Sequence, residues 1–141
     1  MTIDTFYRVI HASSLTDELD ETMRHSLNHS LARMLGCEDW LTELKGTKSR
    51  TGSYASMWLY VEGGATGWWN PTDDMGQAMR CLRKIDDEAV RDRILTYLGD
   101  MIWQRVGPGQ YKKRYFIFDL EPLEICIAIA KALAIDIIEL D

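Results

Sequence analysis

The sequence predicts an α+β fold, in which a small antiparallel sheet of two to three strands is sandwiched by helices in a single domain. Most of the chain carries apolar residues at helical spacing. Two stretches, 54–61 and 111–120, are instead rich in the aromatic and apolar residues typical of strands. A chain of 141 residues fits one domain with one hydrophobic core. Few strands among several helices are typical of α+β proteins.

A short helix is predicted at the N-terminus, over residues 3–12. Ile3, Phe6 and Ile10 recur there at helical spacing. Residues 5–10 also fit a strand, so the pattern leaves that alternative open.

A longer helix follows, because every fourth residue from Leu15 to Leu35 is apolar. Ser14 and Asp17 resemble a capping box at its start, and Gly36 is placed to end it. The opposite side of this helix is polar, which predicts a solvated face.

The remaining elements alternate between strand and helix signals. Pro71 fixes a turn, and Thr72 or Asp73 is expected to cap the helix that follows. Gly99 leaves open whether residues 101–106 continue a helix or begin a strand. The predicted elements are a strand over 54–61, a helix over 72–85, a helical run from 86 with Ala89, Val90, Ile94, Leu95 and Leu98 as its apolar residues, a strand over 111–120, and a last helix with Pro122 in its first turn.

The composition predicts an acidic protein of the cytoplasm. The net charge is −6, which argues against direct nucleic-acid binding and against binding to anionic membranes. The three cysteines are far apart and form no CxxC motif, which favours a reducing compartment. The first residues lack the basic and apolar runs of a signal peptide. The longest apolar stretch, 125–138, is too short and too charged to span a bilayer.

A metal site is considered at His25 and His29, which lie four residues apart and follow Glu21 at the same spacing. No HExxH motif or distant third ligand accompanies them. A polar face on an amphipathic helix explains the same pattern. We therefore expect no metal at these residues.

The sequence also contains no recognised catalytic motif. Cys37, Cys81 and Cys126 lie at or inside helical patterns, where a structural role is favoured over a nucleophile. The segment Gly63–Gly67 is glycine-rich but matches neither a P-loop nor a dinucleotide fingerprint. The basic run Lys112–Arg114 is typical of a protected strand edge. We expect no enzymatic activity and no cofactor.

The aromatic residues around the first predicted strand and its following turn are the candidate contact surface. Exposed Trp and Tyr side chains anchor many protein interfaces, although core packing is the alternative for each of them. The two acidic residues of the turn are also explained as helix caps. The predicted partner-binding residues are Trp58, Tyr60, Trp68, Trp69, Asp73 and Asp74.

Three short motifs carry a resemblance to a known family. They are Leu27, Leu31, Met34, Leu35, Gly36 and Trp40, then the turn 69–74, then the segment 122–128. Over residues 25–135 the chain resembles the small phage and prophage proteins of the phage ABA sandwich family. It departs from the family pattern at residues 37–39 and at Met75. The resemblance implies an α/β/α sandwich over 1–141 with an N-terminal helical extension over 1–24, a phage origin, and no catalytic residues to transfer.

Together these observations predict a phage-encoded, non-catalytic accessory protein in the bacterial host cytoplasm. We expect it to bind a host protein and to inhibit a defence system in an anti-CRISPR-like role. The long apolar stripe of the second helix also allows a homo-oligomer. The alternative is a sponge protein that binds a small molecule or nucleotide, with Gly63–Gly67, Lys112, Arg114 and the tryptophans lining its pocket.

Overall fold

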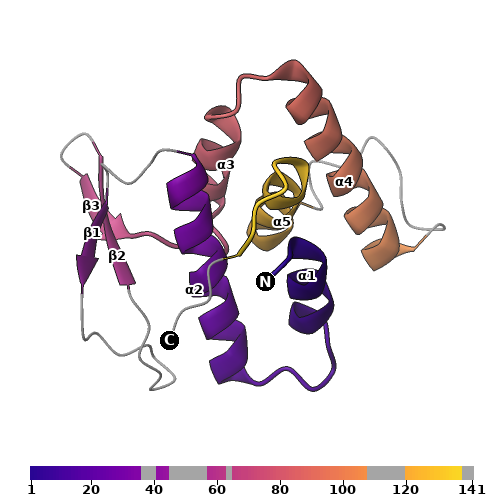
Figure 1. Ribbon diagram of the computed structural model, residues 1–141, viewed down its shortest axis with the longest axis horizontal. Coiled ribbons are helices and arrows are strands. Elements are labelled where there is room, and N and C mark those ends of the chain that lie inside the picture. The colour runs from indigo at the N-terminus through magenta and orange to yellow at the C-terminus, as the bar shows by residue number, and fades with distance from the viewer. Residues whose placement is uncertain (36–40, 45–56, 63–64, 108–119, 138–141) are drawn as a thin grey trace. The chain divides into compact units, whose positions relative to one another are not determined.

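The computed structural model describes residues 1–35, 41–44, 57–62, 65–107 and 120–137 (Figure 1). Contacts divide the chain into two compact units. The first unit comprises Met1–Asn70 with Ile135–Asp141, and the second comprises Pro71–Ala134. Each unit is described by itself, and the single domain over 1–141 stays a prediction.

The first unit begins with helix α1, Ile3–Ile10, which confirms the predicted N-terminal helix. Thr2 caps it by accepting a hydrogen bond from the backbone N–H of Thr5. The Phe6 side chain is fully buried. Met1 exchanges two hydrogen bonds with Ile137, of 3.2 Å and 2.8 Å, so the start of the chain is tied to its C-terminal segment.

Helix α2, Asp17–Met34, is the longest element of this unit. Its N-cap is Thr16, which accepts from the Leu19 N–H, so the predicted capping box at Ser14 is wrong by two residues. The helix ends at Met34, before Gly36, which lies outside the described residues.

The polar side of α2 is buried, so the predicted solvated face is wrong. Ser26 and Ser30 each donate a hydrogen bond to the carbonyl four residues earlier, which satisfies their hydroxyls inside the helix. Buried polar groups need such partners, because an unpaired one costs free energy. The buried polar residues of α2 are Glu21, Ser26, Asn28, His29 and Ser30.

Three short strands pair in an antiparallel sheet of order β1–β2–β3. They are β1, Leu41–Leu44; β2, Met57–Glu62; and β3, Ala65–Trp68. β2 lies within the range of the predicted first strand, apart from one residue at its end. Residues 54–56 of that prediction, and residues 111–119 of the predicted second strand, lie outside the described residues.

The second unit contains α3, Met75–Arg83; α4, Glu88–Val106; and α5, Pro122–Ala132. Asp74 and Asp87 cap the first two of these helices through hydrogen bonds to backbone N–H groups. α3 therefore begins three residues later than predicted, after a turn at 71–73. α4 continues through Gly99 and ends where Gly107 adopts a φ of +79°.

The core of the second unit is built around α5, which Figure 1 shows between α3 and α4. Every residue from Leu123 to Ala130 is buried. A helix that is apolar on all sides has to be covered on all sides. The neighbouring helices of the second unit supply part of this cover.

The predicted fold class, an α+β fold with a sheet sandwiched by helices, is wrong. Helices dominate the described residues, and the more extensive helix contacts are with other helices, not with strands. The second unit holds no strand among its described residues, 71–107 and 120–134. The apolar circumference of α5 explains this difference, because one flat sheet face cannot cover a helix on all sides.

Two neighbouring residues of α4 provide a matched test of this packing. We expect Ile94→Ala to lower the free energy of unfolding by about 2–5 kcal/mol, because Ile94 is fully buried. Leu95→Ala removes an equal number of carbons from a side chain that is 55% exposed and should cost less than about 1 kcal/mol. Urea unfolding followed by circular dichroism measures both. Equal losses for the two variants would contradict the described orientation of α4.

Candidate functional site

The outer side of α4 presents two large apolar side chains to solvent. Leu95 is 55% exposed and Trp103 is 47% exposed. Eight residues of helix separate them by about 12 Å along the axis. Leu95 was named with Ile94 and Leu98 among the apolar residues of the predicted helix; these two are buried, whereas Leu95 is exposed.

Two acidic residues precede Leu95 on the same helix. Glu88 and Asp92 precede Leu95 by seven and three residues, which places all three on one side of the helix. Both carboxylates are exposed, and neither forms an ion pair within the described part of the chain. We call this surface the α4 face, and its residues are Glu88, Asp92, Leu95, Thr96 and Trp103.

An ion pair holds the C-terminal half of α4 against α5. Arg105 Nη2 lies 2.8 Å from Glu124 Oε1, and Arg105 Nε lies 3.3 Å from Glu124 Oε2. This two-point contact restricts the rotation of α4 next to Trp103. Glu124 is buried, and Arg105 also lies 3.5 Å from Glu121. The α4 face is thus presented by a helix whose orientation is fixed.

Trp69, a predicted contact residue, lies in the core of the first unit. It is 4% exposed, and its indole N–H donates a 2.8 Å hydrogen bond to the backbone carbonyl of Asn28. The Asn28 side-chain amide in turn donates to the Asn70 Oδ1 at 3.0 Å. The prediction that Trp69 contacts a partner is therefore wrong, because its ring and its N–H are both used inside the fold.

The remaining predicted contact residues are divided between the two units. Asp73 and Asp74 are exposed and belong to the second unit. The Asp74 carboxylate accepts a 2.9 Å hydrogen bond from the Gln77 N–H, which is the predicted capping role.

The sheet residues belong to the first unit. The register pairs Trp58 with Glu43 and Tyr60 with Leu41, whereas Trp68 pairs with Leu59. The role of Trp58, Tyr60 and Trp68 in binding stays a prediction.

The structure shows the surroundings of the histidine and cysteine side chains that were considered for metal binding or catalysis. His25 Nε2 lies 4.0 Å from Glu21 Oε1, one helical turn away. Within the part of the chain that the structure describes, no three His, Cys, Asp or Glu side chains form a metal-binding group. Cys81 and Cys126 are buried, consistent with their predicted structural role. Cys37, Gly63, Gly64 and Lys112–Arg114 lie outside the described residues.

Comparisons with protein-family models, with curated proteins and with solved structures find no match to the chain. Among the described helices, none is both long and apolar enough to cross a membrane.

The position of Trp69 generates a stability prediction. Trp69→Phe keeps an aromatic ring but removes the indole N–H that bonds the Asn28 carbonyl, which should lower the free energy of unfolding by about 0.5–1.5 kcal/mol. Chemical unfolding of the isolated protein measures this loss. As a control, Trp103→Phe changes an exposed tryptophan in the same way and should leave the stability nearly unchanged. A Trp69→Phe variant as stable as the parent would contradict the buried hydrogen bond.

Proposed function

We propose that this chain is a phage-encoded, non-catalytic accessory protein that binds a protein of the bacterial host through the α4 face. The exposure of Leu95 and Trp103 on one well-packed helix is the observation that carries the proposal. Tryptophan is enriched among the residues that dominate binding energy. A rigid helix holds such anchors in place, so little conformational entropy is lost on binding.

The charge of the α4 face indicates the kind of partner. Glu88 and Asp92 lie on the same side of α4 as Leu95, and the whole chain carries a net charge of −6. A basic surface with an apolar centre complements this arrangement. Acidic charge also speeds association with such a surface at low salt.

Inhibition of a host defence system is the specific form of this proposal. Defence complexes that bind nucleic acid need a basic surface, and an acidic protein can occupy that surface in place of the nucleic acid. The phage setting is supported by the motifs at 69–74 and 122–128, which resemble those of phage proteins. Such an inhibitor acts in the host cytoplasm.

Two further features of the proposal lie in the first unit. Trp58, Tyr60 and Trp68 are proposed as additional contact residues, on the basis of their residue types and strand positions. A homo-oligomer stays compatible with the proposal.

A paired substitution tests the α4 face. We expect Leu95→Ala combined with Trp103→Ala to weaken binding of the host protein at least about 30-fold, the effect of losing one strong anchor residue. The tagged protein is recovered from a bacterial lysate, and native mass spectrometry identifies any partner held at fixed stoichiometry. The affinity of each variant for that purified partner is then measured.

Met34→Ala is the matched control, because Met34 is 56% exposed but lies on α2. It should bind the partner as the parent does. A partner whose affinity is unchanged by the paired α4 substitution would refute the proposed surface. A parent protein that recovers no partner would refute the proposed function.

A further inference from the structure

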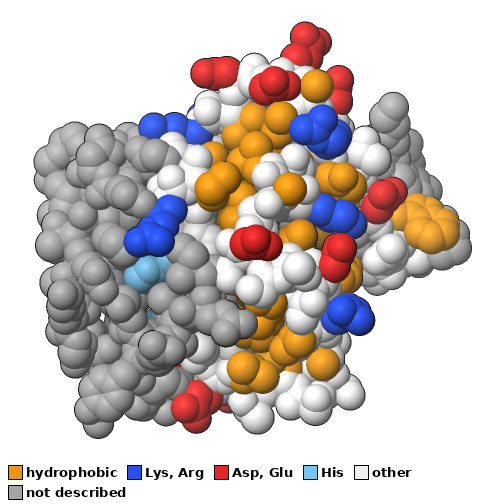
Figure 2. All heavy atoms as spheres, viewed as in Figure 1, with side chains coloured by type: hydrophobic (Ala, Val, Ile, Leu, Met, Phe, Trp, Pro, Cys, Tyr) orange, Lys and Arg blue, Asp and Glu red, His pale blue; other side chains and the backbone are white. Residues whose placement is uncertain are grey.

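A pocket lies between the end of α3 and the first half of α4. Its volume is about 280 Å³, and Leu82, Arg83, Arg91, Ile94 and Leu95 line it. Figure 2 shows hydrophobic side chains gathered between these helices, with basic side chains on either side. The pocket therefore combines an apolar lining with cationic groups.

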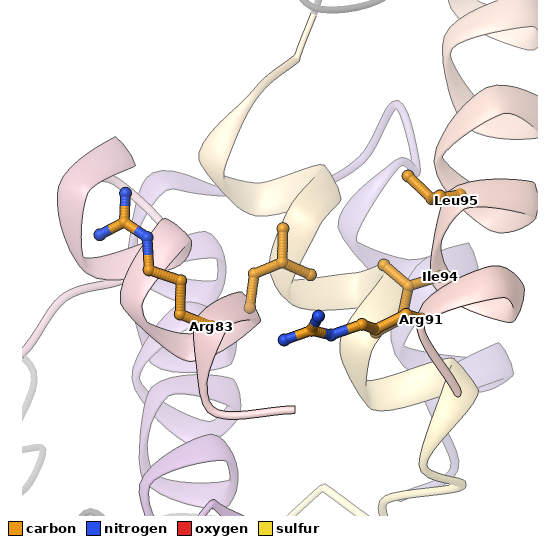
Figure 3. A pocket seen from close by; sticks show the side chains of 5 residues that line it. Arg83, Arg91, Ile94 and Leu95 are labelled. Atoms are coloured by element: carbon orange, nitrogen blue, oxygen red, sulfur yellow. The ribbon is translucent and has the colours of Figure 1, made fainter. Parts of the chain in front are cut away.

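Arg91 supplies the positioned charge of this pocket. In Figure 3 its guanidinium extends from α4 toward α3, alongside the apolar side chains. The Nε–H of Arg91 donates a hydrogen bond to the backbone carbonyl of Ile85, which fixes the orientation of the planar group. The terminal nitrogens form no ion pair with a carboxylate in the ranges that the structure describes.

The nearby acidic residues do not neutralise Arg91. Asp87 lies four residues earlier, but its carboxylate accepts the Val90 N–H as the cap of α4. Glu88 and Asp86 are exposed and are not paired with Arg91.

Arg83 contributes differently. Figure 3 shows its side chain running along α3, with the guanidinium directed away from Arg91. Its aliphatic stem thus forms part of the wall, as arginine stems commonly do.

We infer that this pocket binds a small amphipathic anion, which has a short apolar body and one carboxylate. The planar guanidinium of Arg91 matches the geometry of a carboxylate and can donate two parallel hydrogen bonds to it. Leu82, Ile94 and Leu95 would cover the apolar body. The volume is at the lower end of the range of about 300–1,000 Å³ typical of ligand pockets, so the ligand is small.

This site goes beyond the proposed function, although it shares Leu95 with the α4 face. Trp103, the second anchor of the α4 face, does not line the pocket. A small-molecule function was expected from the sequence at Gly63–Gly67 and Lys112, whereas this pocket is formed by other residues.

Three probes separate the contributions of charge and apolar body. Octanoate carries both, 1-octanol carries only the apolar chain, and inorganic phosphate carries only the charge. Each is titrated into the ¹⁵N-labelled protein, and the amide resonances of residues 82–95 are followed by NMR. We expect octanoate to bind roughly tenfold or more tightly than either other probe, the effect of one charge-assisted hydrogen bond.

Variants assign the effect to Arg91. Arg91→Gln should weaken octanoate binding by roughly tenfold. Arg93→Gln on the same helix changes the net charge equally but lies outside the pocket lining, and it should bind octanoate as the parent does. Thermal unfolding confirms that each variant is folded before titration.

Two results would overturn the inference. One is equal binding of octanoate and 1-octanol to the parent protein, which would show that the charge has no part. The other is no shift of residues 82–95 with octanoate. Both are read on the parent protein, so neither depends on the folding of a variant.

Discussion

The contact between Arg105 and Glu124 links the interior of the second unit to its surface. Glu124 is carried into the core because every residue around it on α5 is buried. A buried carboxylate without a partner is destabilising, so Glu124 needs a positive charge beside it. Arg105 supplies the partner with a contact of 2.8 Å, so α4 has to keep one rotation relative to α5. The positions of Trp103 and Leu95 follow from that rotation.

Fixing α4 in this way gives the helix two distinct sides. Ile94, Leu98 and Ile102 are buried, whereas Leu95 and Trp103 reach solvent. The first half of the same helix also forms one wall of the pocket at Arg91. A single packed helix thus carries both the proposed protein-binding surface and the proposed small-molecule site. Both proposed sites use side chains of α4, whose positions depend on how the buried residues of this helix pack.

The sequence predicted local structure better than it predicted packing. Helices at 3–10 and 122–132 were recognised from apolar spacing and from Pro122, because these signals act within one turn of the chain. The burial of Trp69 was missed, because its partner Asn28 is 41 residues away. The α4 face was missed because Leu95 follows the buried Ile94 directly. The sequence signal that was available is an offset: Leu95 and Trp103 each follow a buried isoleucine by one residue, which turns them by about 100° around the helix.

Site-specific photo-crosslinking in bacterial cells tests the central claim, that α4 is the contact surface, most directly. A photoreactive amino acid replaces Thr96, which is exposed on the α4 face, or Met34 on α2. Our account predicts one discrete adduct with a host protein from position 96 and none from position 34. An adduct from position 34 alone, or no adduct from position 96, would contradict it.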